Sequence, residues 1–537
     1  MTVAVAVVAV AVAESAPADF PVETSAMEPP ADRPAETTSP MTDSPMTRSS
    51  SMALTRSGPV RERDAVLPEA EPVAGLVAGP VAGPVTGRPP HTRHFALAHP
   101  YAALAPTVDV ALRAVRLEAL LSDPYDEANP YGFHGLREGT GTRDGAQRTA
   151  VEAAVRAERV PAADGGRFTA ADDLVRVLRP LFRRDLALGY AHGARALIAA
   201  LEREEPVPAR AGEFAALLGP AALIATTGTV LRAAVRMVAE RGRTEPAVRQ
   251  WRGPLAAAFA DLLACESLVA VGLRASALPG GSGRAVRAAV GYATALVVGG
   301  VLDELDLVLG ECGRPAGSLE RLTLAKLAAD LPRAGSGPAD VSAYQSDVVR
   351  ELPALACAFE RRADTTGAVL FRLGEAMPAR SVPPAPEGDD TLVGVLTGAA
   401  ARLATAVAGG EAVTAALARV AGRLVSEQRA LHGPCLAAAH AGRGEPAVRA
   451  LADRQAMLLL AAAVLGVQGA AAGRGLFLGG EHWALLAATR IAGRLGIGPG
   501  GPAGPADIEA QQRVWAELDG RDRLGVDCDL YATRVLW

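Results

Sequence analysis

Apolar residues recur every three or four positions along most of the chain from Phe95 onward. In the middle of the chain, for example, Leu231, Val235 and Val238 follow one another at this spacing. Such a period places the apolar side chains on one face of an α-helix, which can then pack on a core. We find no run in which apolar and polar residues alternate, as they do in a half-buried strand. The pattern predicts an all-α fold.

Prolines, glycines and short polar stretches divide this pattern into separate helices. A long apolar segment follows Thr169, which is expected to act as the N-cap, with Asp172 in the first turn. Pro180 lies inside that segment and is expected to kink or divide its helix, because proline has no backbone N–H to donate. The other expected helices lie at residues 106–121, 148–159, 214–240, 251–276, 282–309 and 319–331.

Two proline-rich breaks separate the helices into groups. EREEPVPARAGE ends the first group, and SVPPAPEGDD separates the second group from the C-terminal region. We therefore expect a small N-terminal helical domain at residues 95–205, a helical bundle at residues 206–380 and an additional helical region at residues 390–537.

The first 94 residues differ in composition from the rest of the chain. Residues 15–90 are rich in Pro, Ala, Ser and Thr and contain the small repeat VAGLVAGPVAGPVTG. Such a composition offers too little large apolar surface to offset the entropy lost on ordering, so we expect residues 1–94 to be a disordered tail. The apolar run from Val3 to Ala13 has no basic residue before it and is shorter than the roughly 18 residues of a membrane span. We expect no signal peptide, no membrane anchor and a cytoplasmic protein.

Composition and charge exclude several classes of function. Aromatic residues make up 4% of the chain, and the apolar residues are mostly Ala, Leu and Val, which favour closely packed helices. The net charge of -5 provides no basic field, so we expect no nucleic-acid partner. The five cysteines are widely spaced and form no C-x-x-C pair, which argues against disulfides and against a zinc site. We expect buried thiols and no metal.

Three segments of the chain carry motifs in the order of one known family. Residues 159–193 contain VPAADGG, a VP-x-x-x-GG turn, and RDLALGYAHG, an R-D-x-x-L-x-x-x-H-G segment. Residues 230–275 contain FADL, and residues 288–313 form a long apolar segment rich in small residues. Together they resemble the N-terminal helical domain and the C-terminal bundle of the acyl-CoA dehydrogenases, including large actinobacterial members. The resemblance implies a bundle of that C-terminal type and an FAD-dependent oxidoreductase that acts on the CH–CH bond of an acyl thioester.

The middle domain of that family has no counterpart in this sequence. In acyl-CoA dehydrogenases a β-barrel domain lies between the two helical domains and supplies most contacts to the flavin ring and the acyl thioester. Only residues 201–214 are available between the corresponding segments here, which are too few for a barrel. We therefore expect a chain that lacks the β-domain.

The resemblance assigns four residues to the flavin. Arg241, Arg243 and Thr244 match the region that meets the pyrophosphate of FAD, and their guanidinium and hydroxyl groups suit a phosphate. In the family, a Gln-x-x-GG turn holds the adenine half of the flavin across a subunit interface. Gly310 matches the first glycine of that turn, whereas the Gln and the second Gly are absent here. Arginine at the end of a helix is also favourable without any ligand, so this assignment has a purely structural alternative.

The catalytic base is less well matched. Dehydrogenation of an acyl thioester needs a carboxylate that removes the α-proton while the flavin accepts a hydride. The segment LPRAGSGPADVSAYQS, where a Tyr-Glu-Gly-Thr motif would stand, contains no Glu. Glu213 matches an alternative position of the base, although an acidic residue at a helix start is usually a cap.

Three functions therefore stay open. The resemblance implies a flavoprotein that binds FAD and an acyl thioester, and the apolar helix faces suit a homo-oligomer. The eroded motifs favour a catalytically inactive, barrel-less relative, which acts as a helical scaffold or as the subunit partner of an intact paralogue. A third possibility is a helical protein that keeps an acyl or CoA pocket without redox chemistry.

Overall fold

The prediction of an all-α fold is confirmed. The computed structural model describes residues 106–138, 145–278, 283–360, 365–377, 390–407, 411–438, 445–498 and 503–537, which belong to one compact unit. These residues form helices and two isolated β-bridges, and no strand is found among them. The expected disordered tail, residues 1–94, lies outside the described residues.

Helices form the N-terminal part of the described chain at the places where the sequence predicts them. The helix expected at residues 106–121 is α1, and the one expected at residues 148–159 is the longer α3. The elements up to residue 202 are α1 (Pro106–Leu121), α2 (Phe133–Glu138), α3 (Gly145–Arg159), α4 (Ala171–Arg184), α5 (Leu186–Tyr190), η2 (Ala191–Arg195) and α6 (Ala196–Glu202).

Two local predictions in this part are wrong in detail. The N-cap of α4 is Ala170, and the Thr169 hydroxyl donates to the Asp173 carboxylate at 2.9 Å instead of capping the helix. Pro180 does not divide the helix, because nearly all of α4 is buried, which offsets the missing hydrogen bond. The break comes at Asp185, whose backbone is extended and whose side chain accepts a hydrogen bond from the Leu188 N–H at 2.8 Å.

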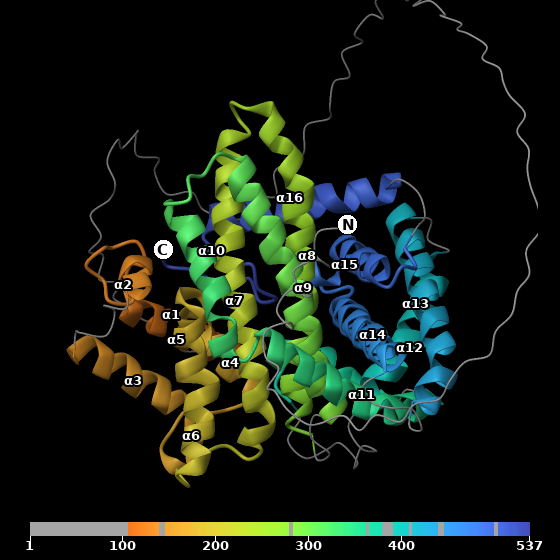
Figure 1. Cartoon of the computed structure of the whole chain (residues 1–537), viewed down its shortest axis with the longest axis horizontal. Coiled ribbons are helices and arrows are strands. Elements are labelled where there is room, and N and C mark those ends of the chain that lie inside the picture. Colours follow the sequence, from red (N-terminus) through yellow and green to blue (C-terminus); the bar gives the residue numbers. More distant parts are fainter. Residues whose placement is uncertain are drawn as a thin grey trace, which may run out of the picture. The chain divides into compact units, whose positions relative to one another are not determined.

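Three long helices pack on one another in the middle of the chain. They are α7 (Ala211–Arg241), α8 (Arg252–Ala275) and α9 (Arg284–Glu311), and each contacts the other two (Figure 1). Helix α8 is buried on nearly every face, whereas α9 exposes one face that includes Leu296 and Leu307. Next come α10 (Leu319–Asp330), which contacts α7 and α9, and α11 (Pro338–Glu360), which packs along α9.

The C-terminal helices pack on this group. They are α12 (Asp390–Ala406), α13 (Ala412–Ala437), α14 (Pro446–Ala471), α15 (Glu481–Arg494) and α16 (Pro505–Leu524). Helices α14, α15 and α16 each contact α8, so the C-terminal helices share a core with the middle ones. After α16 the chain turns at Gly525, whose φ is +63°, and ends in an irregular segment, residues 526–537.

The long apolar helices and most of the cysteines are buried inside the structure. Four helical segments of the described chain are long and apolar enough to cross a membrane, and 72% to 100% of their apolar windows is buried inside the structure: Ala211–Arg241, Pro246–Ala275, Arg284–Glu311 and Pro446–Ala471. Four of the five cysteines are buried free thiols, as expected, whereas Cys357 is exposed.

Candidate functional site

The structure brings two of the expected flavin-binding residues to the same end of the helical group. Arg241 is the last residue of α7, and its Nη1 donates to the backbone carbonyl of Cys312, which directly follows α9. Gly310 lies in the last turn of α9, two residues before that carbonyl. Arg241 and Gly310 therefore lie close together within one chain.

The donors at this place are already engaged by the protein. Arg241 forms a double contact with Glu245, at 3.0 and 2.8 Å from its Nη2, and its Nε lies 3.1 Å from the same carboxylate. The Thr244 hydroxyl donates to the Arg241 carbonyl at 3.2 Å, and Arg243 is exposed. As placed, these side chains form an ion pair at a helix end and do not fit a cradle for the pyrophosphate of FAD.

Space next to Gly310 is also filled. A Cβ at Gly310 would lie 2.9 Å from Nη1 of Arg321. Arg321 is held there by Asp306, whose carboxylate lies 3.0 Å from Nη2. The glycine therefore accommodates an arginine side chain of the same molecule.

Glu213, the expected base, lies far from these groups. It is in the first turn of α7, and at about 1.5 Å per residue it is about 42 Å along the helix axis from Arg241. Its nearest cation is Arg287, with 3.8 Å between Nη1 and Oε2, and its side chain is 34% exposed. This is a partly solvated ion pair, not the dry pocket that a carboxylate base needs.

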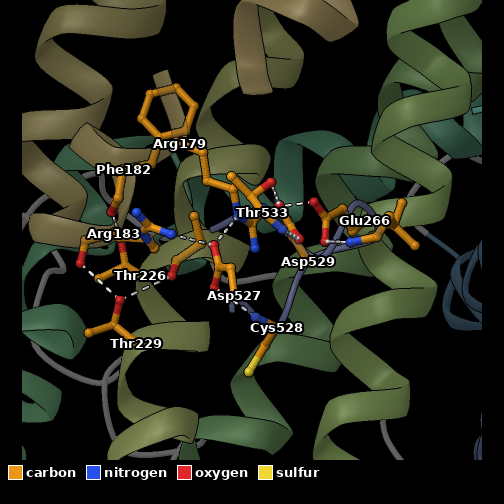
Figure 2. A network of polar contacts seen from close by, with 12 residues as sticks. Arg179, Phe182, Arg183, Thr226, Thr229, Glu266, Asp527, Cys528, Asp529 and Thr533 are labelled. Atoms are coloured by element: carbon orange, nitrogen blue, oxygen red, sulfur yellow. Dashed lines mark hydrogen bonds and ion pairs between the residues drawn. The ribbon is translucent and has the colours of Figure 1, made fainter. Parts of the chain in front are cut away.

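A larger set of charged groups is buried where the C-terminal segment meets α4 and α8. Arg179 and Arg183 are one turn apart on α4 and face the same way. Asp527 lies 2.6 Å from Nε of Arg179 and 3.0 Å from Nη1 of Arg183 (Figure 2). We call the following residues the ionic core: Glu118, Arg179, Arg183, Glu266, Asp527 and Asp529.

Three further carboxylates complete the ionic core, and one of them, Asp529, lies 3.5 Å from Nε of Arg179. Arg179 Nη1 donates to Glu266 on α8 at 2.7 Å, and Arg183 Nη2 donates to Glu118 on α1 at 2.8 Å. Glu118 and Glu266 also accept hydrogen bonds from backbone N–H groups of the C-terminal segment, at 3.2 and 3.3 Å. The ionic core therefore joins helices near the start, the middle and the end of the described chain.

Burial and charge move the carboxyl pKa values of the ionic core in opposite directions. Burial raises the pKa of Glu266 to about 8, and the neighbouring Asp529 and Asp527 act in the same direction while Arg179 opposes them. Burial also disfavours the Asp527 carboxylate, but Arg179 and Arg183 outweigh it and hold the pKa of Asp527 below its usual value. Burial therefore raises the pKa of Glu266, whereas the two arginines lower that of Asp527.

Hydroxyl groups on α7 satisfy the end of α4 beside the ionic core. The Thr226 hydroxyl donates to the Phe182 carbonyl at 2.6 Å, and the Thr229 hydroxyl donates to the Arg183 carbonyl at 3.0 Å (Figure 2). The last carbonyls of a helix have no partner within the helix, so buried helix ends need such donors. The threonines help to fix the backbone that carries the two arginines.

A small cavity lies beside the ionic core. Its volume is about 20 Å³, and Asp172, Arg176, Glu266 and Tyr531 are among its lining residues. The Arg176 guanidinium stacks over the Tyr531 ring, 4.1 Å from its centre. Such a volume holds about one water molecule. The cavity can hydrate Glu266, but an acyl chain or a flavin ring does not fit in it.

The sequence interpretation did not identify the ionic core. The i, i+4 spacing of Arg179 and Arg183 and the two aspartates of DCD near the C-terminus were available signals. The spacing of the two arginines was not distinctive, because the whole chain is rich in arginine. No feature of the sequence around DCD indicates that its aspartates contact α4. Among the described residues, no group of three or more His, Cys, Asp or Glu side chains is placed to hold a metal ion.

A comparison with family models, with curated proteins and with solved structures found no match for this chain. The relationship to the acyl-CoA dehydrogenases therefore rests on the three sequence segments and stays a prediction.

Proposed function

We propose that the chain is a catalytically inactive helical relative of the acyl-CoA dehydrogenases, which serves as a scaffold or as the subunit partner of an intact relative. In this proposal the middle helices correspond to the family's C-terminal bundle and the helices up to residue 202 to its N-terminal domain. The observation that carries the proposal is the pairing of Arg241 with Glu245 and with the Cys312 carbonyl. The cation that would receive a phosphate is used to join α7 to the end of α9.

The use of buried charge supports the same proposal. Two deeply buried ions, Arg179 and Asp527, contact each other, and the cavity beside them holds about one water molecule. A buried ion pair can often be replaced by apolar residues without loss of stability, so we infer that this one serves to fix how distant segments meet. This arrangement suits a rigid scaffold whose polar interior is devoted to assembly of the fold.

A turnover assay tests the proposal. The purified chain is mixed with FAD, with acyl-CoA thioesters of short, medium and long chain, and with an artificial electron acceptor. We expect a rate of acceptor reduction equal to that of the Glu213→Gln variant. Acceptor reduction by the wild type that depends on the thioester and disappears in Glu213→Gln contradicts the proposal.

The second candidate is a flavoprotein that dehydrogenates an acyl thioester. The observation in its favour is the contact between Arg241 and the end of α9, next to Gly310, because the resemblance assigns both residues to FAD. Since that site would be completed across a subunit interface, this candidate requires a homo-oligomer. FAD would also have to displace Glu245 from Arg241.

A further inference from the structure

Several helices of the described chain neutralise the charges on their own surface. A basic side chain pairs with a carboxylate about one turn away on α3, α10, α11 and α16, for example Arg148 with Glu152 and Arg523 with Asp519. Such pairs leave little net charge on the surface of a helix. The exposed sides of α9 and α13 depart from this pattern, because each carries charge of one sign.

The exposed side of α13 is positively charged. Arg419, Arg423 and Arg429 are exposed, and none of them has a carboxylate oxygen within 4 Å among the residues that the structure describes. Glu427, the one carboxylate of this helix, is 11% exposed and is bound to Arg454 on α14 at 2.5 Å. We call the following exposed residues the basic face: Arg419, Arg423, Ser426, Arg429 and Ala430.

The exposed side of α9 combines negative charge with apolar side chains. Leu296 and Leu307 are 45% and 53% exposed, and Asp303 lies between them without a cation within 4 Å in the described part of the chain. The neighbouring carboxylates Glu304 and Asp306 are bound to arginines of α15 and α10. We call the following exposed residues the acidic face: Leu296, Gly300, Asp303, Leu307 and Glu311.

Two adjacent glycines lie in the middle of α9, at the acidic face. A Cβ at Gly299 or Gly300 would meet no atom within 4 Å, so the packing of the described chain does not require a glycine at either position. Glycine inside a helix is destabilising relative to alanine, but it allows another backbone to approach closely. The acidic face is therefore suited to contact with a second helix.

We propose that the basic face of one copy of this chain docks on the acidic face of a second copy. The faces are opposite in charge and similar in length, because Arg419–Arg429 and Leu296–Leu307 each extend over about 15–17 Å of helix. The two faces differ, so the contact is heterologous and joins copies into a ring or a row. This assembly does not depend on whether the chain is catalytically inactive, so flavin binding and turnover do not decide it.

Sedimentation velocity of the full chain at several protein concentrations tests the proposal. We expect self-association that weakens as salt rises from about 50 to about 500 mM, because salt screens exposed charges. Arg423→Glu should raise the Kd of self-association about tenfold or more, since a carboxylate then meets the acidic face. Arg513→Glu is the matched control, because Arg513 is an exposed arginine of α16 outside both faces. It should associate like the wild type.

A charge exchange identifies the partner surface. Asp303→Arg should weaken self-association as Arg423→Glu does, whereas an equimolar mixture of the two variants should associate, because the altered faces are again opposite in charge. A wild type that stays monomeric at every concentration overturns the proposal. So does equal association of the wild type and Arg423→Glu, and so does a mixture that associates no better than the single variants, with all variants folded by circular dichroism.

Discussion

Nε of Arg179 lies 2.6 Å from a carboxylate oxygen of Asp527, although the two residues are 348 positions apart in the chain. The same oxygen lies 3.0 Å from Nη1 of Arg183, one turn further along α4. Asp527 is fully buried, so neither arginine can exchange it for water. The irregular C-terminal segment is therefore an integral part of the core around α4.

Removal of Asp527 should destabilise the protein strongly. Asp527→Ala leaves two buried guanidinium groups without this carboxylate, and breaking a buried pair in this way typically lowers the free energy of unfolding by about 3–5 kcal/mol. Asp519→Ala is the control, because Asp519 pairs with Arg523, which is 69% exposed, and such a pair contributes less than about 1 kcal/mol. Urea unfolding followed by circular dichroism measures both changes. Losses of equal size in the two variants would show that the ionic core is not needed for stability.

Glu266 should make the stability of the protein fall as the pH rises toward 8. Its pKa is raised from 4.5 to about 8 by burial, so the folded state binds a proton that the unfolded state has released. The stabilisation is present below the unfolded pKa and is lost as the pH rises through the folded one, with a slope of at most about 1.4 kcal/mol per pH unit.

The Glu266→Gln variant isolates this effect, because every other titrating group is common to both proteins. Between pH 5 and 8 we expect the free energy of unfolding of the wild type to decline relative to that of the variant. Urea unfolding at several pH values measures the difference. A difference that stays constant, or that grows in favour of the wild type with pH, contradicts the protonated state of Glu266.

Two neighbouring arginines should respond oppositely to the same substitution. Arg183→Met removes the partner of Glu118 and Asp527 and should lower the free energy of unfolding by about 3–5 kcal/mol. Arg184→Met removes a buried cation that has no carboxylate oxygen within 4 Å among the described residues, so we expect an unchanged or higher free energy of unfolding. Chemical denaturation of both variants decides this. A loss of several kcal/mol in Arg184→Met would mean that its hydrogen bond to the Ser122 carbonyl and the charges of Glu118 and Asp123 outweigh the cost of its burial.

Gly466 on α14 allows an aromatic ring to approach the helix backbone. A Cβ at this position would lie 2.3 Å from a ring carbon of Phe371. Gly466→Ala should therefore lower the melting temperature, through about 1–3 kcal/mol of overpacking. Gly422 is an exposed glycine within α13 with open space around it, so Gly422→Ala should raise stability by up to about 1 kcal/mol through helix propensity. Differential scanning calorimetry distinguishes the two signs.

The sequence predicted the helices well because their signal is local. The periodicity of apolar residues located α1, α7, α8 and α9 within a few residues. It did not predict how charged residues from distant helices pair, since Glu118, Arg183 and Asp527 meet only through tertiary packing. The same limit applies to Arg241, whose side chain looked available for phosphate but is bound to Glu245. Pro180 does not divide α4 for a related reason, because burial of the helix outweighs a local preference.

Flavin retention tests the central claim of an inactive helical protein most directly. The purified chain is incubated with excess FAD and desalted, and its absorption is recorded in the visible flavin band. We expect a colourless protein, because the cation assigned to the pyrophosphate is bound to Glu245 and to the Cys312 carbonyl. Stoichiometric flavin that is retained by the wild type and lost in Arg241→Gln would contradict the claim and establish the chain as a flavoprotein.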